Sequence, residues 1–194
     1  MFINWKLREV RLKLVYYGAS LCGKTTNLEF IHANVNPAAR SDLVSLKTRE
    51  DRTIFFDFLE IQLGEVKGLK PKFSLYTVPG QVYYMSSRKL VLQGADGVVF
   101  VVDSHPSRLA ANIEAWQNLR ANLREFGYDP NKFPIIIQYN KRDLSDALPI
   151  ETLRKKLTLD SQFQIEAAAV KGVGVFETLK PAIKAVMVSV QPKL

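Results

Sequence analysis

The sequence predicts an α/β domain with a doubly wound, mostly parallel sheet and one antiparallel edge strand. Residues 98–103 and 135–139 are nearly unbroken apolar runs that end in polar residues, which is typical of strands buried on both faces. Between these runs, apolar side chains from Leu109 to Phe126 recur at helical spacing, as a crossover helix requires. Two β-rich segments, 53–63 and 72–78, are joined by a turn-like stretch and predict the antiparallel pair.

The remaining elements complete the alternation of strands and helices. Residues 12–17 form a short β-rich run, and a glycine loop leads from it into a helical stretch over 24–34. Residues 35–52 show no firm period and contain a proline, so we expect a long loop there. The last helix carries an apolar stripe from Val175 to Val190, and Trp116 in the crossover helix is expected to lie in the core.

Length and composition indicate one domain over residues 1–194. The chain is 47% hydrophobic and 24% charged, a balance typical of folded globular proteins. Its 27 lysines and arginines exceed the 19 acidic residues by 8, but they are spread along the chain and form no basic arm. We therefore expect no specific nucleic-acid partner, while a general affinity for polyanions or an anionic membrane face stays open.

Cysteine usage and the chain ends predict a cytoplasmic protein. Cys22 is single, so an intrachain disulfide is impossible and a reducing compartment is expected. We find no signal peptide, no prenylation box and no apolar run near the roughly 20 residues that span a bilayer, so we expect no transmembrane segment. His32 and His105 are not spaced as a metal pair, so we expect no structural zinc.

A phosphate-binding motif lies between the first strand and the first helix. Residues 18–25 fit G-x-x-x-x-G-K-[ST], in which backbone N–H groups and the helix N-terminus face a phosphate. Lys24 would reach the β- and γ-phosphates and counter charge during reaction, and the Thr25 hydroxyl would ligate Mg²⁺. A tight turn that matches by chance is the alternative, and we interpret Cys22 as a small loop residue, not a redox thiol. The nucleotide-binding residues expected here are Gly18, Ala19, Ser20, Leu21, Cys22, Gly23, Lys24, Thr25 and Thr26.

A second motif, Asn140-Lys141-Arg142-Asp143, follows the apolar run 135–139 and predicts guanine recognition. The Asp143 carboxylate can accept two hydrogen bonds from the guanine N1–H and amino group, and adenine offers no such donor pair. Asn140 can hold the loop and meet the base, while the stem of Lys141 can cover a ring face. This short motif alone is weak evidence, because it occurs often by chance. Its place at the end of a later buried strand, downstream of Lys24, makes the two motifs together stronger evidence than either one.

With both motifs in place, the chain resembles the Ras-like small GTPases, which are P-loop NTPases, over nearly its whole length. Residues 77–81, Thr-Val-Pro-Gly-Gln, are similar to the switch II motif of that family. Three stretches are more closely similar to bacterial gliding-motility and polarity GTPases of the MglA type: residues 16–27 around the phosphate loop, residues 52–58 and residues 77–82.

The resemblance implies a GTP-binding molecular switch that hydrolyses GTP to GDP and phosphate, uses Mg²⁺ and controls cell polarity or gliding motility. It also implies a GTPase-activating partner with a Roadblock domain, of the MglB type and homodimeric, together with polarity or motility effectors and recruitment to a cell pole. A nucleotide-holding scaffold with negligible turnover stays open as an alternative. A small-molecule kinase is disfavoured, because residues 140–143 predict guanine and no lid-like arginine cluster follows.

Residues of the switch segments receive roles from the same resemblance. Thr53 is similar to the switch I threonine that joins Mg²⁺ and the γ-phosphate, and Gly80 is expected in the nucleotide site. Gln81 would orient the attacking water. Arg52 is similar to the arginine finger that MglA-type enzymes supply in cis, and Arg49 is its rival in the same segment.

The chain departs from the Ras-like pattern at Thr77, in the segment 168–170 and at Ser20. Thr77 stands where an aspartate usually holds a magnesium-bound water, although MglA-type proteins share this replacement. Asp57 could project towards the same place, and a solvated acid on the strand face is the alternative. Ala168-Ala169-Val170 takes the place of the Ser-Ala-Lys motif and keeps a backbone N–H at Ala169. Ser20 replaces a frequent glycine and would crowd the γ-phosphate slightly.

Overall fold

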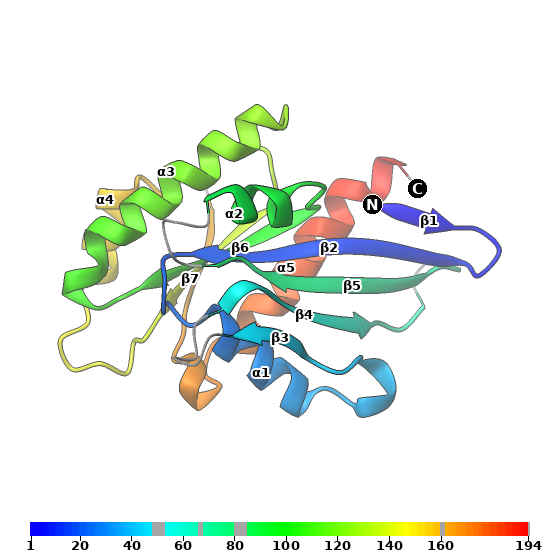
Figure 1. Ribbon diagram of the computed structural model, residues 1–194, viewed down its shortest axis with the longest axis horizontal. Coiled ribbons are helices and arrows are strands. Elements are labelled where there is room, and N and C mark those ends of the chain that lie inside the picture. Colours follow the sequence, from blue (N-terminus) through cyan, green and yellow to red (C-terminus); the bar gives the residue numbers. More distant parts are fainter. Residues whose placement is uncertain (48–52, 66–67, 80–84, 160–161, 194) are drawn as a thin grey trace.

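The computed structural model describes residues 1–47, 53–65, 68–79, 85–159 and 162–193. These residues form one eight-stranded sheet with helices on both faces (Figure 1). The strands are β1 (Phe2–Asn4), β2 (Glu9–Gly18), β3 (Val44–Lys47), β4 (Thr53–Gln62), β5 (Lys70–Thr77), β6 (Gly97–Asp103), β7 (Ile135–Asn140) and β8 (Phe163–Glu166). The α-helices are α1 (Lys24–Asn34), α2 (Met85–Leu92), α3 (Leu109–Glu125), α4 (Ile150–Leu157) and α5 (Val175–Val190).

The strand order is β3-β4-β5-β2-β6-β7-β8, and β1 pairs with β2. Strands β5, β2, β6, β7 and β8 are parallel to one another, whereas β4 is antiparallel to β5 and β1 is antiparallel to β2. The predicted α/β class with a mostly parallel, doubly wound sheet is therefore confirmed. Parallel neighbours place their carboxyl ends at one edge of the sheet, where the ligands of such folds bind.

The loop predicted over residues 35–52 is wrong in part, because it contains β3 and a 3₁₀ turn, Pro37–Ala39. Strand β3 pairs antiparallel with β4, so β3 and not β4 forms that edge of the sheet. The strand has only four residues, and its register with β4 shifts between Ser45 and Lys47. A segment this short and irregular leaves no alternation that a sequence pattern can show.

Two hydrophobic cores lie on the two faces of the sheet. Side chains of Leu14 and Tyr16 enter the core beneath α1 and α5, while Val15 and Tyr17 enter the core beneath α2, α3 and α4. Figure 1 shows α1 on one side of the sheet and α2 and α3 on the other. Trp116 is buried against Phe100, as expected of a core residue.

Several predicted elements match the structure closely, and the α-helices and strands that were not predicted are all short. Helix α1 spans the residues expected of it, and α3, α5, β6 and β7 lie within a residue or two of their predicted bounds. The unpredicted elements β1, β8, α2 and α4 have eight residues or fewer. Among the described residues, no helix has both the length and the apolarity to cross a membrane.

Candidate functional site

The phosphate loop occupies the turn between β2 and α1, at the carboxyl edge of the sheet. Two of its glycines are required by close approach. A Cβ at Gly18 would lie 2.4 Å from the Val101 carbonyl oxygen, and one at Gly23 would lie 2.1 Å from the Asn140 side-chain nitrogen. Gly23 also has a φ of 100°, in the left-handed region that glycine tolerates. The backbone therefore curls tightly before α1 begins at Lys24.

The ammonium group of Lys24 lies inside this loop. Its Nζ donates to the carbonyl oxygens of Ala19 at 2.7 Å and Gly18 at 3.2 Å, and it lies 3.7 Å from the Cys22 sulfur. The side chain is buried, and burial lowers the pKa of Lys24 because desolvation disfavours the charged form. A bound anion would offset that cost, so the loop places its one buried cation where a phosphate is expected.

Asn140 joins the phosphate loop to residues 168–170, which are called the base-side loop below. Its Nδ2 donates to the Cys22 carbonyl oxygen at 2.8 Å, and its Oδ1 accepts the Ala169 N–H at 2.9 Å. The predicted holding role of Asn140 thus has a geometric basis. The backbone N–H that the loop 168–170 keeps at Ala169 therefore donates to Asn140 in this structure.

Lys171 approaches the predicted base-reading residue Asp143. The Lys171 Nζ lies 3.6 Å from Asp143 Oδ2, and it comes from the 3₁₀ turn Ala169–Lys171. Val170 takes the place of the lysine of the Ser-Ala-Lys motif, and the structure shows that the lysine one position later, Lys171, lies beside Asp143. The signal for it was adjacent in the sequence, because Lys171 directly follows Val170.

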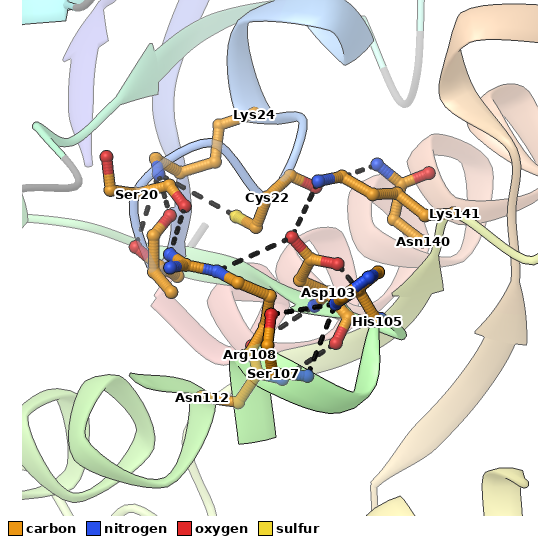
Figure 2. Close-up of polar contacts among 12 residues, drawn as sticks. Ser20, Cys22, Lys24, Asp103, His105, Ser107, Arg108, Asn112, Asn140 and Lys141 are labelled. Atoms are coloured by element: carbon orange, nitrogen blue, oxygen red, sulfur yellow. Dashed lines mark hydrogen bonds and ion pairs between the residues drawn. The ribbon is translucent and has the colours of Figure 1, made fainter. Parts of the chain in front are cut away.

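A buried carboxylate that the motifs did not identify lies between the two loops. Asp103 ends β6 and is fully buried, and Lys141 Nζ donates to its Oδ2 at 2.6 Å. Arg108 Nε lies 3.8 Å from the same oxygen, and Figure 2 shows both cationic side chains converging on Asp103. Its sequence signal was the polar end of the apolar run 98–103, at the edge where ligands are expected.

A second buried carboxylate, Asp57, lies beside the predicted magnesium ligand Thr25. Asp57 Oδ2 accepts hydrogen bonds from the hydroxyls of Thr25 at 2.5 Å and Thr77 at 2.8 Å, and Asp57 Oδ1 accepts one from Ser45. The side chain of Asp57 is fully buried, so its interpretation as a solvated strand-face acid is wrong. Hydroxyl and carboxylate oxygens are the ligand types that Mg²⁺ prefers.

Part of the predicted site is outside the described residues. Gly80 and Gln81 of switch II, and Arg52 with its rival Arg49, belong to that part. Strand β4 begins at Thr53, whose side chain is not among those described. The roles expected of these residues remain predictions.

Comparison with known proteins adds a family relationship. Residues 1–186 match the model of the ADP-ribosylation factor family. The chain is 54% identical over 186 residues to the mutual gliding-motility protein MglA of Myxococcus xanthus (strain DK1622). The matched residues are 96% of this chain and 95% of that protein. It is 25% identical over 188 residues to the Ras-related protein Rab-32C of Dictyostelium discoideum, covering 94% of this chain and 76% of that protein. With human ADP-ribosylation factor-like protein 4A it shares 23% identity over 154 residues, or 75% of this chain and 66% of that protein.

Proposed function

Since the chain belongs to the ADP-ribosylation factor family of small GTPases and is of the MglA type, we propose that it is a GTP-hydrolysing switch that controls gliding motility or cell polarity. The observation that carries the proposal is the double hydrogen bond of Asn140, which ties the phosphate loop at Cys22 to the base-side loop at Ala169. A phosphate site and a guanine site are thereby held at one edge of the sheet.

Guanine selection is assigned to Asp143. Its carboxylate accepts from the N1–H and the amino group of guanine, and the nearby Lys171 ammonium helps to hold the carboxylate in place. Lys141, anchored on Asp103, keeps its stem beside the base. The Ala169 N–H donates to Asn140. The remaining edge of the base is therefore assigned to other backbone groups of the 3₁₀ turn Ala169–Lys171.

The residues around Asp57 fit a magnesium ion. Thr25 would bind the ion directly, with Thr53 joining it in the GTP state, while Asp57 orients the Thr25 hydroxyl from behind. Asp57 thereby supplies the carboxylate that the Ras-like pattern carries at position 77. When bound, Mg²⁺ supplies positive charge to the β- and γ-phosphates.

Hydrolysis is assigned to Lys24, Gln81 and Arg52. Lys24 counters charge on the γ-phosphoryl group, Gln81 orients the attacking water and Arg52 acts as a finger in cis. A homodimeric partner with a Roadblock domain would then stimulate turnover by stabilising the arrangement of Gln81 and Arg52. We further infer that the switch acts in the cytoplasm and is recruited to a cell pole, where motility effectors bind its GTP state.

Multiple-turnover release of phosphate from GTP tests this function. We expect slow release from the protein alone and a strong increase when a Roadblock-domain partner is added. Binding of GTP without turnover under either condition would contradict the switch and support a scaffold that merely holds nucleotide.

A further inference from the structure

Arg108 links helix α3 to the phosphate loop. It is the last residue of the 3₁₀ turn Pro106–Arg108 and directly precedes α3. Its Nη2 donates to the Ser20 carbonyl oxygen at 2.7 Å, although the two residues are 88 positions apart. Its Nε lies 3.8 Å from Asp103 Oδ2, and 33% of its side chain is exposed. None of the motifs at this site assigns a role to Arg108.

The anchor of Arg108 is fixed from several sides. Asp103 Oδ1 accepts the His105 N–H at 3.1 Å, while Lys141 holds Oδ2. Asn112 of α3 pairs with both backbone groups of Asp103, at 3.1 Å to its N–H and 2.8 Å to its carbonyl oxygen (Figure 2). The buried Asp103 carboxylate is held in place by these contacts. It therefore fixes the position of the Arg108 guanidinium, which donates to the Ser20 carbonyl oxygen.

This contact determines how the peptide between Ser20 and Leu21 is oriented. In a planar trans peptide the C=O and N–H point in opposite directions. With the Ser20 carbonyl turned to Arg108, the Leu21 N–H points to the opposite side of the loop. Leu21 has a φ of 60°, a left-handed conformation that is costly for any residue with a Cβ. A flip of this peptide would release Leu21 from its left-handed φ, and it would place the Ser20 carbonyl oxygen where the Leu21 N–H now lies. The backbone conformation of Leu21 by itself therefore favours the flipped peptide.

We propose that Arg108 is a positioning residue of the phosphate loop, which keeps the Leu21 N–H directed at the terminal phosphates of the bound nucleotide. Loops of this kind present N–H groups to phosphates, and a carbonyl oxygen in that place would repel the anion. The Lys24 ammonium, which meets the β- and γ-phosphates, bonds Gly18 and Ala19, so the first half of the loop faces the terminal phosphates. The inference rests on the nucleotide binding proposed above.

The proposal predicts a loss that depends on the number of phosphates. GMP lacks the β-phosphate, and the contact between Lys141 and Asp103 does not need Arg108. Arg108→Met keeps most of the side-chain stem and removes every donor. The lost hydrogen bond is charge-assisted, so we expect GDP to bind about 10- to 100-fold more weakly to this variant. GMP affinity should not change.

The experiment measures GDP and GMP affinities by competition against a fluorescent guanosine diphosphate. Arg108→Lys should be intermediate, since an ammonium reaches the Ser20 carbonyl or Asp103 but does not bridge them as a guanidinium does. The matched control is Arg120→Met, on helix α3, which Arg108 directly precedes. The Arg120 guanidinium contacts Asn131 and the Trp116 ring and not the phosphate loop. The control should bind both nucleotides like the unmodified protein.

Three results would overturn the proposal: unchanged GDP affinity, an equal loss for GDP and GMP, or a GDP loss that disappears in about 1 M salt, as a long-range charge effect would. If Arg108→Met does not fold, the amide resonance of Leu21 in the GDP complex of Arg108→Lys decides. It should shift from that of the unmodified protein, and an unchanged resonance contradicts the proposal. An unmodified protein that binds neither GDP nor GTP would instead refute the proposed function.

Discussion

Replacing Asp57 by asparagine should weaken magnesium retention and leave the nucleotide site otherwise intact. The Asp57 side chain is fully buried and accepts hydrogen bonds from the Thr25, Thr77 and Ser45 hydroxyls. Asparagine keeps its shape, but it carries no charge and replaces one acceptor oxygen by a donor. Since Thr25 is the expected magnesium ligand, the variant removes the group behind the ligand and not the ligand itself.

The magnitude follows from the place of Asp57 behind the ligand. Loss of a partner that orients a metal ligand typically lowers metal affinity about 10- to 100-fold, which is about 1.4–2.7 kcal/mol. The Asp57 carboxylate is fully buried, at 0% exposure, so solvent does not compensate for its loss. We therefore expect the upper half of that range.

The assay follows the release rate of a fluorescent GDP over a titration of free Mg²⁺. Asp57→Asn should shift the midpoint to higher Mg²⁺, whereas its release rate in excess chelator should match that of the unmodified protein. Glu60→Gln is the control, because Glu60 lies on the same strand, β4, and is only partly buried. An unchanged midpoint would refute the reasoning, and tighter Mg²⁺ retention would show that Asp57 competes with the ion for Thr25.

The remaining predictions concern base choice, hydrolysis and alkaline stability. Asp143→Asn should lose about 1.5–3 kcal/mol of binding free energy for guanine nucleotides and should favour xanthine nucleotides. Competition between GDP and xanthosine diphosphate for the variant measures this preference. Arg52→Ala and Gln81→Leu should each bind GTP nearly normally yet lose most of the partner-stimulated turnover, about 10³- to 10⁵-fold where the arginine finger is removed. An effect of Arg49→Ala with none of Arg52→Ala would show that Arg49 is the finger. Burial raises the pKa of Tyr17 to about 12, so the folded state keeps a proton that the unfolded chain releases near its ordinary pKa. Stability should therefore fall as pH rises above that ordinary value, and the melting temperature of Tyr17→Phe should fall less steeply.

Prediction from the sequence succeeded where one local pattern determined an element. Helix α1 was predicted from Lys24 to about Asn34 and spans Lys24–Asn34, because the G-K-T end of the phosphate motif fixes its start. Strand β7 was recognised because it is buried on both faces and reads as an apolar run. Strand β3 and helix α4 are short, so tertiary contacts with β4 and α3 define them more than their own sequences do.

The same distinction applies to the site. Asn140 and Asp143 were identified because their motif directly follows a buried strand. Arg108 was missed because its contact with Ser20 joins residues 88 positions apart and depends on how the turn before α3 folds back. Asp57 was proposed, but only the pairing of β4 with β5 places it beside Thr77. Both contacts join segments that are far apart in the sequence, and the pattern within one segment does not identify which distant side chain it meets.

The central claim, a guanine-nucleotide switch at the carboxyl edge of this sheet, is tested most directly by identifying the nucleotide that the purified protein carries. Mild denaturation releases the bound molecule, and chromatography against standards fixes its base and its phosphate number together. We predict GDP or GTP. Recovery of an adenine nucleotide, or equal affinity of the emptied protein for ADP and GDP, would contradict the account.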